Sequence, residues 1–380
     1  MGANHIATTS RSHNIVVVGA GVAGLVLSLL LKRAGIEHVL LSRKETQKPL
    51  PLGETLPPSA FGLLDRLDLS PLFEQCGTPT YGYQSMWGSE RIAEQQFFGQ
   101  QPRSTGLKLD KAALIKALQQ EVKEHVLEFD DLLEAAADAE SARLTLNAGN
   151  KRIEATSKLV VDATGRARAL LKRLGIGQQR FDNTVASYCH VPRIAHPQLM
   201  HGVYIESFAE GWGIVSHLDE ERTAITVFTN KGNAVLRHLK HFEGWQKALA
   251  ETVILKDFLA AGPLSKVSGR QANSSKAAQL AGKRWLAIGD AGIAFDPLSS
   301  HGITNAIYGA HRGFEAIRAQ LGDAQSNALA TYAETLNRIF DGYLRQRGGL
   351  YASEQRWRTE FWAEQMRLRK SPVAHGADAS

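Results

Sequence analysis

The N-terminal part of the chain contains the run Ile15-Val16-Val17-Val18-Gly19-Ala20-Gly21-Val22-Ala23-Gly24. Its four consecutive β-branched residues predict a buried parallel strand. Gly19, Gly21 and Gly24 match the pattern G-x-G-x-x-G, and residues 25–34 continue as an apolar helix. Such glycines allow a tight turn, approach of the backbone to a pyrophosphate and close packing of helix on strand. The helix N-terminus adds free N–H groups and a positive dipole end. The run therefore predicts a Rossmann-type dinucleotide site.

Composition places few limits on function. Of 380 residues, 43% are hydrophobic and 22% are charged, which is ordinary for a globular enzyme and enough for two domains. Lys and Arg exceed Asp and Glu by 44 to 38. This mild, scattered excess does not predict nucleic-acid binding. It leaves open a docking face for an acidic protein partner or simply a well-solvated basic surface.

Cysteine usage and hydropathy indicate a reducing compartment. Cys76 and Cys189 are the only cysteines, with no spacing for a disulfide framework or a metal site. No run approaches the roughly 20 apolar residues that span a bilayer, and residues 1–12 lack the apolar run of a signal peptide. We therefore expect a cytoplasmic protein without a metal or a membrane contact.

The second predicted strand, residues 37–41, is followed by Ser42 and Arg43. Dinucleotide-binding folds usually place an acid at this strand end to hold the ribose hydroxyls. Ser42 can still bond a hydroxyl, with Arg43 against the adenine or the phosphates. The alternative is that both residues lie in a plain exposed loop.

Two later buried strands also end in turns of small residues, Asp162-Ala163-Thr164-Gly165 and Gly289-Asp290-Ala291-Gly292. The second turn leads to Asp296-Pro297-Leu298-Ser299-Ser300-His301-Gly302 and a predicted helix from Ile303. Gly53-Glu54-Thr55-Leu56-Pro57-Pro58 forms a stiff turn. Its Glu54 is either a cofactor-side residue or a simple turn acid.

Alternating segments at 185–191, 203–208, 213–218 and 223–228 predict an antiparallel sheet, and residues 79–105 contain further aromatic-rich strands. A helix is expected at 108–124, with Asp110 near its N-cap. The expected parts are a nucleotide domain (13–78, 106–177 and 276–325), a substrate domain (79–105 and 178–275), C-terminal helices (326–370) and flexible tails (1–12 and 371–380).

Taken together, the motifs at 19–24, 162–165 and 289–290 resemble the glutathione-reductase-like FAD fold of class A flavin monooxygenases and flavin-dependent halogenases. The resemblance implies an α/β fold: an FAD-binding Rossmann domain interrupted by an antiparallel-sheet substrate domain, with a helical C-terminus. It also implies non-covalent FAD, with Asp290 on the ribityl chain and the helix from Ile303 directed at the flavin ring. From the dinucleotide pattern and this resemblance together, the expected cofactor-binding residues are Gly19, Gly21, Gly24, Ser42, Arg43, Gly165, Gly289, Asp290, Asp296, Pro297 and Gly302.

Two features of the halogenases are missing. Those enzymes need a lysine after the Gly-Glu motif to carry the hypohalous species, and this chain has no lysine between Lys48 and Lys108. Their Trp-x-Trp-x-Ile-Pro motif is also absent, and Gly211-Trp212-Gly213-Ile214 is the nearest likeness. Both absences argue against halogenation.

The turn at 53–58, Tyr351-x-x-x-x-Arg356-Trp357 and Phe361-Trp362 are most similar to the LodB/GoxB-type flavoprotein maturases. This resemblance implies an FAD-dependent monooxygenase that oxygenates a tryptophan in a partner precursor, an amine or amino-acid oxidase, toward cysteine tryptophylquinone. Aromatic C-terminal helices also occur simply to pack a core. Glu54 and His301 are candidate catalytic residues for proton transfer, and a structural role suits each equally well.

Three alternatives remain open from the sequence. The protein could hydroxylate a small aromatic metabolite, or bind flavin and act only as a maturation chaperone for the precursor. A reductase of saturated bonds is more distant. Because no second nucleotide-binding Rossmann unit is visible, the electron donor is either transiently bound NAD(P)H or a separate reductase.

Overall fold

The structure is a computed structural model that describes residues 7–44, 50–97, 103–323 and 325–370. Its main sheet carries the predicted strand 15–18 at the centre, with parallel neighbours on both sides. The strand order is β19 (Ala281–Gly282), β20 (Trp285–Ala287), β11 (Lys151–Asp162), β1 (Ala7–Val18), β2 (His38–Arg43) and β8 (Val126–Phe129), with β10 (Ala142–Ala148) antiparallel to β11 and β9 (Asp131–Ala137) antiparallel to β10.

Strand β1 begins earlier than the sequence predicts. Residues 7–12 pair in parallel with residues 151–156 of β11, so this part of the expected tail 1–12 is strand. The first half of β11 also pairs with β10. Its other edge pairs with the backbone of residues 7–12, although this segment contains polar residues such as Ser10 and Ser12. Residues 1–6 and the expected tail 371–380 lie outside the described residues.

Helices pack against the main sheet and against one another. Helix α1 (Val22–Arg33) packs against α4 (Lys111–Glu121) and α7 (Gly302–Gly322). Asp110 caps α4 as expected, because its Oδ1 accepts hydrogen bonds from the N–H groups of Ala112 and Ala113 at 2.9 and 3.0 Å. The start of the expected helix 108–124 is instead strand β7 (Gly106–Leu109). Shorter helices are α2 (Phe61–Arg66), α3 (Ser70–Glu74) and α5 (Ala169–Arg173).

The second sheet has seven strands and contains the four segments predicted from alternation. Its order is β17 (Ser268–Gln271), β13 (Thr184–Pro192), β16 (Arg222–Asn230), β15 (Gly211–His217), β14 (Val203–Phe208), β5 (Gly82–Met86) and β6 (Ala93–Gln96). All neighbours are antiparallel except β14 and β5. One face of this sheet packs against residues of α6 (Phe242–Ala248) and the 3₁₀ segments η4 (Ala234–Lys240) and η5 (Leu255–Leu259).

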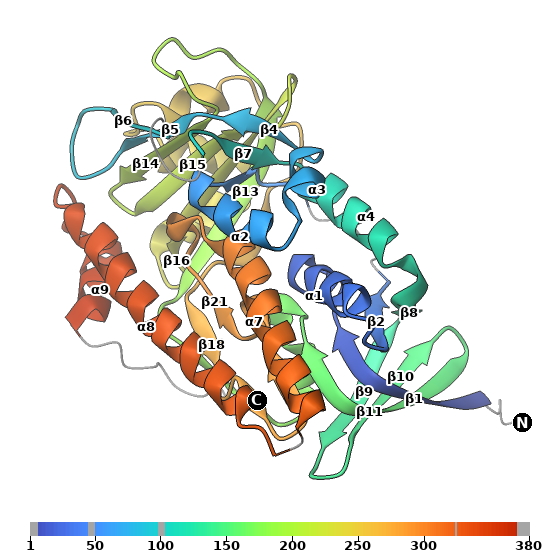
Figure 1. The fold of residues 1–380 in the computed structure, drawn as a ribbon. Coiled ribbons are helices and arrows are strands. Elements are labelled where there is room, and N and C mark those ends of the chain that lie inside the picture. The colour runs from blue at the N-terminus through green and yellow to red at the C-terminus, as the bar shows by residue number, and fades with distance from the viewer. Residues whose placement is uncertain (1–6, 45–49, 98–102, 324, 371–380) are drawn as a thin grey trace, which may run out of the picture.

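The described residues also form two three-stranded sheets. One is β3 (Glu54–Leu56), β7 and β4 (Gly77–Thr80), and the other is β12 (Gln178–Arg180), β18 (Ser275–Ala277) and β21 (Ile293–Ala294). Helix α8 (Ala328–Ser353) lies beside α7 and leads to α9 (Glu360–Lys370) near the seven-stranded sheet (Figure 1). The expected α/β fold with an antiparallel-sheet part and a helical C-terminus is confirmed. Among the described helices, none is long and apolar enough to cross a membrane.

Candidate cofactor and active site

The three strand-end motifs lie at neighbouring carboxyl ends of the main sheet. Val18 pairs with Asp162, and Asp162 pairs with Ala287. Hydrogen bonds continue past the strand ends, from Ala163 N–H to Val18 O at 2.8 Å and from Ile288 N–H to Asp162 O at 2.9 Å. The carboxyl edge of a parallel sheet is where such folds bind ligands.

The glycines of the first motif differ in what surrounds them. A Cβ at Gly24 would lie 1.9 Å from Gly19 O, and a Cβ at Gly19, whose φ is +112°, would lie 2.5 Å from Ala163 O. A Cβ at Gly21, Gly165 or Gly302 would meet nothing within 4 Å. The first two glycines therefore permit close packing, whereas the last three border open space. No side chain caps the N-terminus of α1, and its first turn carries no acid, so its N–H groups are available to a phosphate.

The buried carboxylate of Asp162 stabilises the turn of the second motif, residues 162–165. The side chain is fully buried and accepts hydrogen bonds from Thr164 N–H at 2.8 Å, Thr164 Oγ1 at 2.7 Å and Leu171 N–H at 2.9 Å. Burial raises the pKa of Asp162, and these hydrogen bonds offset part of the rise. Asp162 is therefore a structural residue of the turn.

Arg166 connects the second motif to the third. Its Nε lies 3.5 Å from Oδ2 of Asp290, and its Nη2 donates to Phe295 O at 2.7 Å. The side chain of Asp290 remains 35% exposed, so its carboxylate is accessible to a ligand hydroxyl. A Cβ at Gly289 would lie 2.9 Å from the Cβ of Ala23, which places the third motif beside the first turn of α1.

Glu54 is held in an ion pair. Lys111, the first residue of α4, places its Nζ 3.0 Å from Oε1 of Glu54. The Lys111 charge lowers the pKa of Glu54, and the Glu54 charge raises the pKa of Lys111. Asp290 and Arg270 also act electrostatically on Lys111. Both side chains of the pair are partly exposed, so the Glu54 carboxylate is accessible from solvent.

The residues expected along the flavin ring lie on one loop, residues 296–302, which we call the flavin loop. Asp296 is fully buried, and its Oδ1 accepts from Leu298 N–H at 2.8 Å. Ser300 has a left-handed φ of 53°, an unusual conformation for a residue with a side chain. His301 precedes α7 and is exposed. The loop thus brings Pro297, His301 and the free N-terminus of α7 together.

Ser42 and Arg43 are the last two residues of β2 and do not form a separate loop. Arg43 donates to Asp130 O and to Oδ1 of Asp131, both at 3.0 Å, and its side chain is 70% exposed. Their assignment to the ribose and the adenine stays a prediction.

Three charged residues near the candidate site were not predicted from the sequence: Lys111, Arg166 and Arg270. A signal existed for two of them, because Lys111 follows the helix cap Asp110 and Arg166 follows the turn 162–165. Arg270 had no local signal. It lies on β17 with its guanidinium carbon 4.8 Å from the ring centre of Tyr188.

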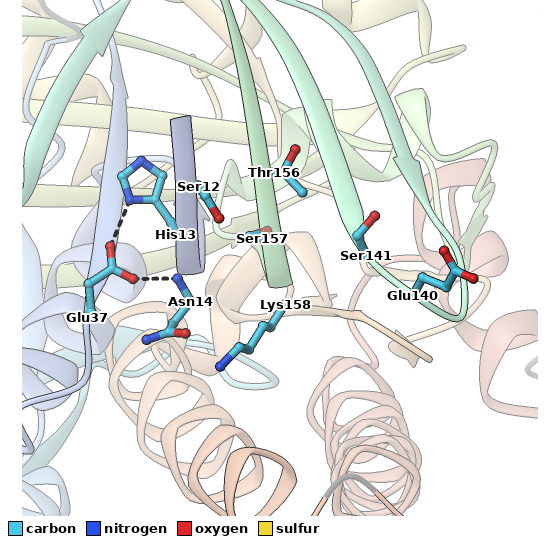
Figure 2. A pocket seen from close by; sticks show the side chains of 9 residues that line it. All are labelled: Ser12, His13, Asn14, Glu37, Glu140, Ser141, Thr156, Ser157 and Lys158. Atoms are coloured by element: carbon cyan, nitrogen blue, oxygen red, sulfur yellow. Dashed lines mark hydrogen bonds and ion pairs between the residues drawn. The ribbon is translucent and has the colours of Figure 1, made fainter. Parts of the chain in front are cut away.

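A separate surface pocket of about 300 Å³ lies away from these residues, around the middle of β1 and β11. Figure 2 shows the Glu37 carboxylate facing the ring of His13 and the backbone nitrogen of Asn14, with Ser157 and Lys158 on the next strand. None of the residues predicted for the cofactor lines this pocket, so it is not part of the candidate site.

A family model for an FAD binding domain matches residues 12–346. The chain belongs to this FAD-binding family. The open space at Gly21, Gly165 and Gly302, the uncapped α1 and the accessible Asp290 fit such a cofactor. The match and the relatives identify the protein as an FAD-dependent enzyme of the oxidoreductase and monooxygenase group.

The relatives include an FAD-dependent oxidoreductase and halogenating enzymes. The chain is 27% identical to the putative FAD-dependent oxidoreductase LodB of Marinomonas mediterranea, over 93% of this chain and 96% of LodB. It is 22% identical to a 1H-pyrrole-2-carbonyl-[peptidyl-carrier protein] brominase of Pseudoalteromonas luteoviolacea, over 81% of this chain and 78% of the brominase. The expected resemblance to the monooxygenase and halogenase group, with LodB as a relative, is confirmed.

Two solved structures share the fold. The flavin-dependent halogenase CmlS superimposes with a TM-score of 0.79 at 22% identity, covering 93% of this chain and 68% of CmlS. The peptidyl tryptophan dihydroxylase QhpG, which is essential for tryptophylquinone cofactor biogenesis, gives a TM-score of 0.72 at 22% identity, covering 93% and 79%.

Proposed function

We propose that the protein is an FAD-dependent monooxygenase that oxygenates a tryptophan side chain of a partner precursor protein during the biogenesis of a quinone cofactor. The precursor would be an amine or amino-acid oxidase. The similarity to LodB over nearly the whole of both chains supports this proposal, and so does the fold shared with QhpG, a peptidyl tryptophan dihydroxylase.

The observation that carries the proposal is a group of half-buried apolar side chains that joins the flavin loop to the seven-stranded sheet. Leu298 of the loop and Ile205 and Ile214 of the seven-stranded sheet are half-buried and pack against the same aromatic cluster. In that cluster the rings of Trp212 and Phe228 stack with their centres 4.0 Å apart. We infer that a flat, electron-rich indole would pack against these half-buried side chains, because aromatic rings pack well against apolar surfaces.

In this proposal, bound FAD supplies the oxygen chemistry and the chain positions the reactants. The glycines of the first motif and Asp290 hold the cofactor. The N–H groups at the start of α7, which no side chain caps, would face the flavin ring and favour negative charge on it. Because its pKa is lowered by Lys111, Glu54 is an anion at neutral pH and can accept a proton but not donate one. We assign His301, exposed at the start of α7, as the second candidate for proton transfer.

The first two lysines after Glu54 in the sequence have partners, which supports oxygenation over halogenation. Lys111 is paired with Glu54 at 3.0 Å. Lys108 donates to Gly202 O at 3.0 Å, and burial lowers its pKa to about 8. Neither of these two amines is a free replacement for the lysine that halogenases use.

The test is mass spectrometry of the tryptophan peptides of a precursor oxidase encoded next to this protein. The precursor is incubated with oxygen, FAD and NADH or NADPH, with and without the protein, and with added chloride or bromide. We expect one tryptophan to gain one or two oxygen atoms and no halogen. The same reaction with free tryptophan serves as the small-molecule control.

The other outcomes separate the alternatives. Halogen on the peptide would overturn the proposal. An unmodified precursor together with oxygenated free tryptophan would support a small-molecule hydroxylase. If the precursor matures only when the protein is present but without any oxygen taken up during the incubation, the chaperone alternative would be supported.

A further inference from the structure

The carboxylate of Asp296 lies under the flavin loop and is held by helix α8. Arg347 donates from Nε to Asp296 Oδ2 at 3.1 Å, and Tyr351 donates its hydroxyl to the same oxygen at 2.8 Å. The backbone N–H of Asp296 donates to the hydroxyl oxygen of Tyr343 at 2.6 Å. Three residues of one helix therefore fix the first residue of the loop.

Arg347 also connects the loop to two other parts of the chain. Its Nη2 lies 3.3 Å from Oδ2 of Asp182, just before β13, and donates to Oε1 of Gln365 in α9. The Arg347 side chain is 5% exposed, and those of Asp182 and Asp296 are 1% and 0% exposed. A buried arginine with this many partners fixes geometry because its guanidinium has rigidly placed donors.

Tyr351 extends the contact to the substrate-domain sheet. Its hydroxyl accepts a hydrogen bond from Nε1 of Trp212 in β15 at 3.0 Å while it donates to Asp296. Its ring lies 4.3 Å below the guanidinium carbon of Arg347. The flavin loop, the sheet face beside it and the C-terminal helices thus share one buried polar network.

The network carries two carboxylates against one guanidinium. Burial raises the pKa of Asp296, and Arg347, Leu298 N–H and Tyr351 offset part of that rise. For Asp182, burial also favours the neutral acid, but Arg347 and hydrogen bonds from Ser274 and Thr184 bring its pKa below the ordinary value. Removing a donor to Asp296 would therefore destabilise its anionic form inside the protein.

We propose that Tyr351 and Arg347 are positioning residues for FAD: through the Asp296 carboxylate they fix the flavin loop relative to the substrate-domain sheet. This goes beyond the substrate proposed above, and it rests on the proposed placement of the flavin ring along residues 296–302. In the proposed arrangement, neither Tyr351 nor Arg347 touches the cofactor. Both act through Asp296.

The test begins with Tyr351→Phe, which removes one hydroxyl and keeps the ring. Losing a hydrogen bond to a charged group predicts FAD binding weaker by about tenfold, together with a changed visible circular dichroism spectrum of the bound flavin. FAD affinity is measured by fluorescence titration of the apoprotein, and thermal unfolding reports whether the fold is kept.

Tyr332→Phe is the matched control. Tyr332 is a buried tyrosine of the same helix, but its hydroxyl donates to Ala287 O at 2.7 Å and not to Asp296. We expect this variant to lose stability without changing the flavin spectrum. If both variants change the spectrum alike, or if Tyr351→Phe folds and changes neither affinity nor spectrum, the inference is overturned.

A double-mutant cycle tests whether Asp296 carries the effect. In an Asp296→Asn background, Tyr351→Phe should change FAD affinity by less than about twofold, since interacting residues are not additive. A full tenfold loss in that background would contradict the inference. Should Tyr351→Phe fail to fold, Trp212→Phe removes the N–H donor to Tyr351 and should change the visible circular dichroism of the bound flavin relative to Tyr332→Phe. A spectrum identical to that of Tyr332→Phe would overturn the inference.

Failure of this inference is distinguishable from failure of the cofactor placement. If Asp290→Ala and Gly21→Val retain FAD at normal affinity, the placement itself is wrong. If those variants lose FAD while Tyr351→Phe behaves like Tyr332→Phe, only the role of the network is wrong.

Discussion

At the residue scale, Asp290 offers an accessible carboxylate among the residues proposed to bind FAD. Its carboxylate is 35% exposed and lies 3.5 Å from Nε of Arg166. We expect Asp290→Ala to weaken FAD binding by about 1.5–3 kcal/mol, the usual loss for a hydrogen bond to a charged group. Isothermal titration of the apoprotein with FAD measures this. Normal affinity in the variant would mean that the ribityl chain binds elsewhere.

Glu54 gives a prediction in pH. Its folded-state pKa is lowered, with Lys111 as the largest cause, so its contribution to stability is present above the unfolded pKa and is lost as the pH falls through the folded pKa. The side chains of Glu54 and Lys111 are 31% and 41% exposed, and solvent screens such pairs. Glu54→Gln should therefore lower the free energy of unfolding by less than about 1 kcal/mol at pH 7. Urea unfolding of the apoprotein should show this difference vanish in acid, and a difference that grows in acid would contradict it.

At the scale of one element, different glycines in the strand–turn–helix unit of β1 and α1 are expected to serve folding and cofactor binding. A Cβ at Gly21 meets nothing within 4 Å, whereas a Cβ at Gly24 would lie 1.9 Å from Gly19 O. Gly21→Val should therefore give a folded apoprotein that does not retain FAD, because its side chain enters the space of the pyrophosphate. Gly24→Val should disrupt helix packing and lower the melting temperature. Flavin absorbance and thermal unfolding of both variants test this, and a Gly21→Val protein with bound FAD would refute it.

The local sequence pattern predicted which strands and helices form better than it predicted the residues at which they begin and end. The β-branched run 15–18 and the alternating segments from 185 to 228 gave strands where expected, because each buries one or both faces. The extension of β1 to Ala7 depends on a partner 144 residues away, Lys151, since 151 − 7 = 144. The pairing of Glu54 with Lys111 spans 57 residues. Contacts of this kind are set by topology, so no local signal in the sequence could identify them.

The C-terminal aromatic residues show the same limit at a larger scale. Tyr351, Phe361 and Trp362 form a buried cluster with Trp212 of the seven-stranded sheet, so the packing role that the sequence left open is present. The hydrogen bond from Tyr351 to Asp296 could not be predicted, because it requires knowing that α8 passes under the flavin loop.

At the scale of the whole molecule, the proposed cofactor site is assembled from distant segments: 19–24 and 162–166 at two strand ends, Glu54, Lys111 and 289–302. FAD that binds only the folded arrangement stabilises it by mass action, and each tenfold rise in free FAD above its Kd adds about 1.4 kcal/mol. The melting temperature should therefore rise steadily with FAD concentration.

The same site predicts that FAD leaves when the protein unfolds. A covalent link to sulfur needs a reactive thiolate, but burial raises the pKa of Cys189 to about 12 and also raises the pKa of Cys76. We expect the purified protein to be yellow and to release all of its flavin on denaturation in guanidinium, measured as absorbance in the filtrate. A control filtration of the native holoprotein should retain the flavin. A melting temperature that does not respond to FAD would contradict the preceding prediction of a site assembled only in the folded protein. Flavin that stays with the denatured chain would contradict non-covalent binding.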